Sequence, residues 1–168
     1  KKQYGFNSIS LMPTNLFGPG DNYHPLNSHV LASFIRRFIE AKENGIEEVI
    51  CWGSGSPMRE FLHVDDLAEA ILFVIEQWEF IHKSEFKDNN GEILSFFNVG
   101  TGKDISIKNL AILISGIIGY EGNIKWDNSK PDGTLKKLLD VSRLNDLGWS
   151  PKINFEDGLK KTIQSYKK

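Results

Sequence analysis

The residues from Pro13 to His29, PTNLFGPGDNYHPLNSH, combine amide and imidazole side chains with many turn-forming residues. An apolar run before this segment predicts a strand that stops at the proline, and a helical pattern follows it. Asn15, His24 and His29 therefore lie on a loop at the carboxyl end of a predicted strand, where open α/β folds bind their ligands. A metal site made of Asp21 and the two histidines matches no specific metal motif. This loop is the first candidate for chemistry.

Three further segments place charged side chains beside turn residues: Trp52–Arg59 (WGSGSPMR), Glu60–Asp66 (EFLHVDD) and Lys130–Lys137 (KPDGTLKK). Guanidinium groups bind phosphate oxygens in pairs, and an indole stacks a nucleobase at about 1–3 kcal/mol. One aromatic side chain and several cations could combine in this way, namely Trp52 with Arg37, Arg59, Lys136 and Lys137. Together they suit a nucleoside diphosphate.

Taken one at a time, these residues also have ordinary structural interpretations. A strand tryptophan such as Trp52 is more often part of a core, and Arg59 alone would be solvated or ion-paired. His63 and Asp65 most simply start a helix, and they offer too few ligands for a metal ion. Cys51 is interpreted as a buried small hydrophobe rather than a nucleophile. Only the combination of residues points to a binding site.

The composition is that of an ordinary globular domain. The chain has 168 residues, of which 40% are hydrophobic and 25% charged, which is enough for one domain with a buried core. Its net charge of −2 gives no general attraction to nucleic acid or membrane, and no apolar run approaches a membrane span. The single cysteine excludes an internal disulfide framework and fits a reducing compartment. We therefore expect a cytoplasmic protein with no nucleic-acid or membrane partner.

Helical patterns alternate with short β-like runs along the chain. The predicted helices are Ser28 to about Asn44, Asp65 to about Phe80, Ser106–Ile118, Ser142–Leu147 and Phe155–Tyr166. The predicted strands are Ser8–Met12, Glu48–Trp52, Leu94–Val99, Asn123–Trp126 and Lys137–Asp140. We expect Asp65 and Asn154 to be N-caps, and the polar segment Lys83–Glu92 to be an exposed loop. The alternation favours an α/β or α+β layer arrangement. The abrupt opening, KKQYG, suggests that the numbering starts inside a longer protein.

Four segments together resemble the GDP-L-fucose synthases, which are extended short-chain dehydrogenase/reductases. They are PTNLFGPGDNYHPLNSHV, WGSGSPMREFLHVDDLA, NVGTG and KPDGTLKKLLDVSRLNDLGW. REFLHVDDLA and NVGTG recur across nucleotide-sugar epimerases and dehydratases, whereas NSH, the WGSG–PMR pairing and KPDGT are more particular to this family. The resemblance covers nearly the whole chain but only the C-terminal half of such an enzyme. It implies an α/β fold: residues 1–27 end a Rossmann-type NAD(P)-binding domain, and residues 28–168 mainly form a smaller α/β substrate-binding domain, with some segments returning to the Rossmann part.

Enzymes of this family epimerise GDP-4-keto-6-deoxy-D-mannose beside its ketone and reduce it with NADPH to GDP-L-fucose. Their glycine-rich cofactor loop, their YxxxK pair with its partner serine and their epimerisation cysteine have no counterpart in this sequence, and Cys51 does not correspond to that cysteine. The resemblance therefore implies a catalytically incompetent portion of an enzyme that uses NADP(H) and a GDP-sugar. It also implies a homodimer for the whole enzyme and a monomer for the portion alone.

The resemblance assigns roles to individual residues. His29, within NSH, resembles the catalytic histidine, and an imidazole titrates close enough to neutrality to act as either acid or base beside a ketone. The cofactor-binding residues of the resemblance, at the nicotinamide end, are Pro13, Thr14, Asn15 and Leu16, with His29. The substrate-binding residues are Arg37, Trp52, Arg59 and Asp132, with Lys137 as a further contact. No metal site is expected.

Two alternatives stay open. The chain could belong to a different nucleotide-sugar epimerase or dehydratase of the same superfamily, from which His29 would distinguish it, because simple 4-epimerases need no acid/base there. It could also be a non-catalytic module that binds nucleotide sugars. An in-frame YxxxK upstream of Lys1 would exclude that second alternative.

Overall fold

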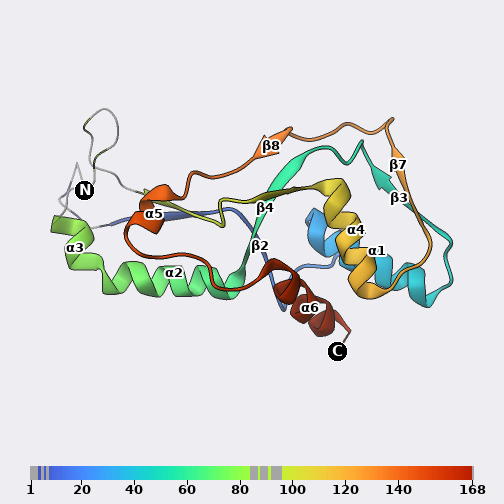
Figure 1. The fold of residues 1–168 in the computed structure, drawn as a ribbon, viewed down its shortest axis with the longest axis horizontal. Helices are drawn as coiled ribbons and strands as arrows, with labels where there is room; N and C mark the ends of the chain where they lie inside the picture. Colours follow the sequence, from blue (N-terminus) through green and yellow to red (C-terminus); the bar gives the residue numbers. More distant parts are fainter. Residues whose placement is uncertain are drawn as a thin grey trace.

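The computed structural model describes residues 4, 6, 8–83, 87, 91 and 96–167 and has an elongated shape (Figure 1). The helices are α1 (Val30–Glu43), α2 (Val64–Glu76), α3 (Trp78–Lys83), α4 (Ile107–Ile118), α5 (Ser142–Asp146) and α6 (Phe155–Tyr166). The strands are β1 (Ser10–Pro13), β2 (Asn15–Phe17), β3 (Glu48–Trp52), β4 (Met58–His63), β5 (Phe96–Val99), β6 (Asp104–Ser106), β7 (Asn123–Asp127) and β8 (Lys136–Lys137). Over these residues, we find no helix with the length and apolar character needed to cross a membrane.

The strands form small, mainly parallel sheets. β1 pairs with β5, β3 pairs with β7, and both pairs are parallel. β4 is the central strand of the remaining sheet: β2 and β8 run parallel to it, and β6 runs antiparallel. Parallel pairing separated by helices confirms the α/β class predicted from the sequence. The arrangement also makes β4 the strand against which several distant segments align.

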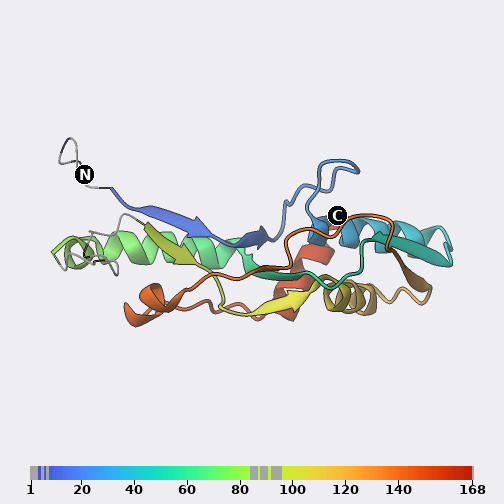
Figure 2. The same ribbon diagram turned by 90° about the horizontal axis from the view of Figure 1, so that it is seen from above.

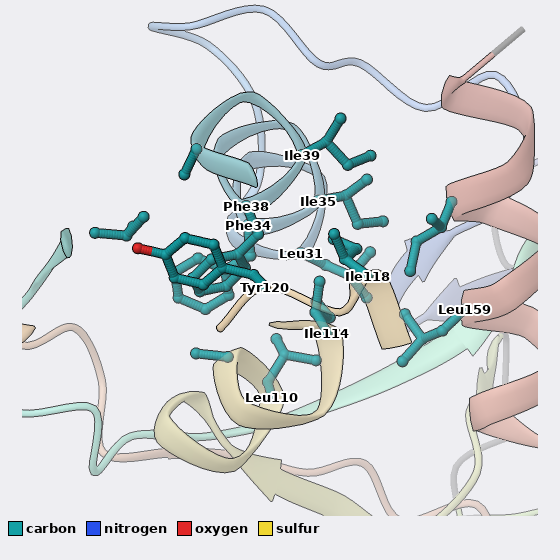
Figure 3. Close-up of a cluster of buried hydrophobic side chains, with 14 of the residues drawn as sticks. Leu31, Phe34, Ile35, Phe38, Ile39, Leu110, Ile114, Ile118, Tyr120 and Leu159 are labelled. Carbon is teal, nitrogen blue, oxygen red and sulfur yellow. The ribbon is translucent and has the colours of Figure 1, made fainter. Parts of the chain in front are cut away.

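The larger core lies between α1, α4 and α6 (Figure 3). Phe34 and Phe38 are one helical turn apart on α1, and their ring centroids lie 5.8 Å apart. Phe38 also contacts Tyr120, with 5.5 Å between ring centroids. Opposite them, α4 contributes Leu110 and Ile114, both fully buried. Residues three and four apart share one face of a helix, so the apolar pattern of α1 is what brings these rings together.

A second, smaller core lies where α2 covers β1 and β5 (Figure 2). Ala70 and Val74 of α2 pack there with Phe97 and Val99 of β5. Trp149, from the segment that follows α5, is buried in the same cluster. Segments from the middle and the end of the chain thus pack beside its first strand. The proposed domain boundary after residue 27 stays a prediction.

α1, α4 and α5 differ from their predicted bounds by one or two residues, and the larger corrections concern the predicted helix from Asp65 to about Phe80. α2 begins at Val64, and its N-cap is His63 rather than Asp65, because the buried imidazole Nδ1 accepts the Asp65 backbone N–H at 3.2 Å. The predicted helix that runs to about Phe80 is two helices, α2 and α3, which are separated at Gln77. α6 has the predicted bounds, and Asn154 is its N-cap as expected.

The strands were predicted less completely. β2, β4 and β6 were missed, and the predicted strand at Lys137–Asp140 is only the short β8 at Lys136–Lys137. β4 was missed because Arg59 and Glu60 interrupt its apolar pattern and a helix start follows directly. β3 has the predicted bounds. Leu94, Ser95 and most of the segment Lys83–Glu92 lie outside the described residues.

Replacement of Phe38 by alanine should lower the free energy of unfolding by about 3–5 kcal/mol, because it leaves a cavity in the larger core. Phe38 is 0% exposed, whereas Leu26 is 87% exposed and serves as the control. Leu26→Ala should change the free energy of unfolding by no more than about 0.5 kcal/mol. Urea unfolding measures both. Equal effects of the two substitutions would contradict this packing.

Candidate functional site

Thr14 and Asn15 lie at the carboxyl end of β1, next to β4. The Thr14 backbone N–H donates to Val99 O at 3.0 Å, which continues the pairing of β1 with β5 by one residue. The Thr14 hydroxyl and the Asn15 amide then both donate to the backbone oxygen of Glu60, at 3.2 and 2.7 Å. The segment predicted to bind a cofactor is therefore attached by its own side chains to the middle of β4.

The side chain of Glu60 is 0% exposed and is held by backbone N–H groups of two other segments. Oε1 accepts the N–H groups of Thr101 and Gly102, at 2.5 and 2.7 Å. Oε2 accepts the N–H of Leu139 at 3.0 Å. A buried carboxylate is costly unless such donors replace water, and all three groups are donors. Sequence reasoning did not single out Glu60, although a carboxylate inside the otherwise apolar run EFLHV was a signal.

Gly100 has to be a glycine for this arrangement. A Cβ built on it would overlap Glu60 Oε1. The absence of a side chain lets the loop after β5 approach the carboxylate closely enough for two N–H groups to reach it. This close approach is a structural reason for the first glycine of NVGTG. From the sequence alone, that glycine was noted only as part of a motif shared by nucleotide-sugar enzymes.

A second set of contacts joins the loop after β3 to the loop before β8. The Asp132 carboxylate accepts the Ser54 backbone N–H at 2.9 Å and the Ser54 hydroxyl at 2.6 Å. Two residues later, Thr134 O accepts a hydrogen bond from Arg59 Nη1 at 2.6 Å. We call the residues Trp52–Ser54, Asp132–Thr134 and Arg59 the bracket. The bracket brings together three of the predicted substrate-binding residues, from segments far apart in the sequence.

The bracket leaves Trp52 at the surface. Its side chain is 74% exposed, so the ordinary interpretation of a core tryptophan is wrong. Lys130 Nζ lies 5.7 Å from the centroid of the Trp52 ring, in cation–π geometry. The neighbouring Gly53 has φ +77°, and a Cβ on it would overlap the Asp132 carboxylate. The Trp52 ring is therefore accessible to a ligand, and the turn that positions it requires a glycine at residue 53.

A pocket of about 570 Å³ lies between Trp52 and the start of α1. This volume is within the usual range for small-molecule sites, about 300–1,000 Å³. Its lining includes Ser28, Val30, Ser33, Arg36, Arg37 and Trp52. Arg37 is fixed there by a hydrogen bond from its Nη2 to the backbone oxygen of Ile50. Arg36 was missed by sequence reasoning, although it is adjacent to Arg37 and pairs with Glu40 one turn later.

His29 is the N-cap residue of α1, between the two pocket-lining residues Ser28 and Val30. Its side chain is exposed, and among the residues that the structure describes it makes no capping hydrogen bond to α1. The imidazole of His29 therefore does not cap the helix. The structure brings Arg37 and Trp52 together in the pocket, and His29 is adjacent in sequence to two of its lining residues. The bracket joins Arg59 and Asp132 to the turn that follows Trp52.

The remaining predicted residues lie around this region. Pro13 is the last residue of β1 and pairs with Val99, while Leu16 is half-buried in β2. Lys137 is exposed in β8, in register with Arg59. Cys51 is a free, buried thiol, as expected for a buried small hydrophobe, and burial is the main cause that raises its pKa.

The chain is similar to known proteins along almost its entire length. The sequence model described as "NAD dependent epimerase/dehydratase family" matches residues 1–88. GDP-L-fucose synthase 1 of Arabidopsis thaliana is 50% identical over 166 residues, which is 99% of this chain and 47% of the relative. GDP-L-fucose synthase of Escherichia coli (strain K12) is 50% identical over 163 residues, 97% of this chain and 50% of the relative.

A solved structure, a GDP-mannoheptose C4 reductase from Campylobacter jejuni with NADP bound, superposes with a TM-score of 0.81 at 34% identity. The match covers 99% of this chain and 52% of that chain. The chain thus spans about half the length of the curated relatives it matches.

The bracket makes a prediction about the pKa of Asp132. Hydrogen bonds from Ser54 hold this pKa below its ordinary value of 3.8, so the carboxylate strengthens the bracket above that pH and loses the contribution as the pH falls through the lowered pKa. Ser54→Ala removes the hydroxyl donor and should raise the pKa of Asp132 toward 3.8. Carboxyl carbon NMR titration measures the change.

Asp127 is the matched control for that titration. Ser129 lowers the pKa of Asp127 in the same way, through its hydroxyl and its backbone N–H. Ser54→Ala should leave the pKa of Asp127 unchanged. If the pKa of Asp132 also stays unchanged, Ser54 does not hold the carboxylate.

Proposed function

The chain belongs to the NAD dependent epimerase/dehydratase family, and on that premise we propose that it is the C-terminal, substrate-binding half of a GDP-L-fucose synthase. The whole enzyme would epimerise GDP-4-keto-6-deoxy-D-mannose beside its ketone and reduce it to GDP-L-fucose. The observation that carries the proposal is the pocket between α1 and Trp52, with the bracket beside it. The pocket contains Arg37 and Trp52 and the bracket contains Arg59 and Asp132, and the family resemblance assigns these four residues to the sugar nucleotide.

The substrate half of the proposal follows from the charges around the pocket. Arg37 and Arg59 supply guanidinium groups, each with five N–H donors in a planar fork, which suits the oxygens of a pyrophosphate. Trp52 offers an exposed ring on which the nucleobase or the sugar can pack. Asp132 already accepts two hydrogen bonds from Ser54, so its first role is to hold the bracket in shape. Lys137 supplies a further positive charge from β8.

The catalytic half of the proposal assigns His29 to the carbons beside the ketone. The ketone acidifies the hydrogens on these carbons, and inversion needs a base on one face and an acid on the other. An imidazole can serve as either at moderate cost. Such a group contributes typically about 10²–10⁴ in rate. The side chain of His29 is exposed at the start of α1, and Ser28 and Val30 on either side of it in the sequence line the pocket.

The residues at the carboxyl end of β1 fit the nicotinamide end of NADP(H). β1 and β5 are parallel, and dinucleotides bind at the carboxyl edge of such strands. Pro13, Thr14, Asn15 and Leu16, with His29, would hold the cofactor there. When bound, NADPH supplies the hydride for the reduction. This chain's residues would orient the nicotinamide, because Thr14 and Asn15 are anchored on β4.

The proposal places the Tyr/Lys pair, the glycine-rich loop and the epimerisation cysteine in the other half of the enzyme. The chain alone is then expected to be inactive, the whole enzyme to be a cytoplasmic homodimer, and the isolated chain to be a monomer. Formation of GDP-L-fucose from GDP-4-keto-6-deoxy-D-mannose and NADPH by the whole protein tests the function directly. Release of a different sugar nucleotide would assign it to another epimerase or dehydratase.

In the whole protein, His29→Gln should slow the exchange of solvent deuterium into the carbons beside the ketone by about 10²–10⁴, because it removes an acid/base group. GDP affinity should stay nearly unchanged, since little binding area is lost. The control is His24→Gln, in the same loop, where the imidazole Nδ1 accepts the Leu26 backbone N–H. Exchange at the wild-type rate in the His29 variant would refute the catalytic role.

Arg59→Ala in the whole protein should weaken GDP binding by about 1.5–3 kcal/mol, the usual contribution of a hydrogen bond to a charged group. Arg143→Ala on α5, outside the pocket and the bracket, is the control and should bind GDP like the wild type. Calorimetric titration with GDP measures both affinities. Unchanged affinity in the Arg59 variant would remove Arg59 from the site.

A further inference from the structure

Three consecutive residues of β4 hold the loop that leads from the bracket to β8 and beyond. The Met58 backbone N–H donates to Leu135 O at 2.8 Å, and Arg59 Nη1 donates to Thr134 O. Glu60 then accepts the Leu139 N–H on its carboxylate. The first two contacts use partners before β8, and the third uses a partner after it. The carboxylate of Glu60 therefore fixes the far end of this loop.

The same carboxylate is the point where two otherwise separate loops meet. Oε1 binds the loop after β5, and Oε2 binds Leu139. The backbone oxygen of Glu60 anchors Thr14 and Asn15. One buried residue thus contacts the segment proposed to hold the cofactor, the NVGTG loop and the loop that carries Asp132 and Lys137. Its backbone oxygen binds the cofactor segment, and its carboxylate binds the NVGTG loop and Leu139.

We propose that Glu60 is a positioning residue for the sugar nucleotide, which acts by holding the loop of residues 132–139 against β4. It touches neither substrate nor cofactor. Its buried carboxylate holds Leu139, two residues after Lys137, and so keeps Lys137 in place beside Arg59 on the pyrophosphate side of the site. This inference rests on the proposed function and names a residue to which the family resemblance assigned no role.

Glu60→Gln distinguishes the two contacts of the carboxylate, one with the loop after β5 and one with Leu139. A glutamine side chain has one acceptor oxygen and one NH₂ group, which only donates. The oxygen can keep the two N–H groups of Thr101 and Gly102, but the NH₂ group would then face the Leu139 N–H. The end of the loop is released, whereas the backbone oxygen that anchors Thr14 and Asn15 stays in place. The substitution should therefore affect sugar-nucleotide binding far more than cofactor binding.

The experiment uses the whole protein and calorimetric titration with GDP and, separately, with NADPH. Glu60→Gln should raise the Kd for GDP at least tenfold, which is about 1.4 kcal/mol, and change the Kd for NADPH less than twofold. Amide hydrogen exchange at Leu139 should become faster. An unchanged Kd for GDP in a folded Glu60→Gln protein would overturn the proposal, as would equal losses of both affinities.

Asp66→Asn is a matched control for loss of stability. Asp66 is also a buried carboxylate, 2% exposed, and it accepts the backbone N–H groups of Lys152 and Ile153 at 2.9 and 3.2 Å, away from the pocket. Its substitution should lower thermal stability and leave both Kd values unchanged. If the Asp66 variant lost GDP affinity as much as the Glu60 variant, the effect would be one of general stability, and the positioning role would fail.

Two further results complete the test. If Glu60→Gln does not fold, Glu60→Asp retains the charge on a shorter arm that cannot span both loops, and the same rise in the Kd for GDP is expected. A wild-type protein that does not bind GDP would refute the proposed function itself. A wild-type protein that binds GDP beside a Glu60 variant of equal affinity would refute only the positioning role.

Discussion

The carboxylate of Glu60, buried in β4, is the constraint on which the site depends. Taking a carboxylate out of water costs several kcal/mol unless donors replace the lost hydration. Here the donors are the backbone N–H groups of two loops, so the charge is tolerated only when both loops take their observed positions. The hydrogen bonds that stabilise the buried Glu60 carboxylate therefore also fix the geometry of the loops at the surface site. Loops alone would not supply such order, because they are the more mobile parts of a fold.

The position of β4 follows from how the two cores divide the molecule. Phe61 of β4 belongs to the larger core and Leu62 to the smaller one, so the strand passes from one to the other (Figure 1). The packing of α1 on α4 fixes the pocket wall that carries Arg37, and the packing of α2 on β5 fixes the loop that binds Glu60. The larger core therefore supports the pocket, and the smaller core supports the loop after β5 that binds Glu60.

Local patterns predicted much of this structure. The apolar periodicity of residues 30–43 and 155–166 gave helices close to their observed bounds, and the turn chemistry and cations indicated a phosphate-containing ligand. The strand at residues 58–63 was missed, because its charged residues have partners only in the folded chain. The N-cap of α2 was also predicted wrongly, as Asp65 instead of His63. Aspartate is a common N-cap residue, and only the fold shows that the buried His63 imidazole accepts the backbone hydrogen bond here.

The sequence by itself determined the class of fold, the resemblance to a nucleotide-sugar family and the candidate residues of its site. Residue types and short spacings carry that information, because helix periodicity and turn preferences are local. Only the tertiary structure decided that Trp52 is exposed, that Asp132 is bound by Ser54 and that Glu60 joins two loops. The last two outcomes depend on hydrogen bonds between residues more than 40 positions apart, whose partners no local pattern specifies.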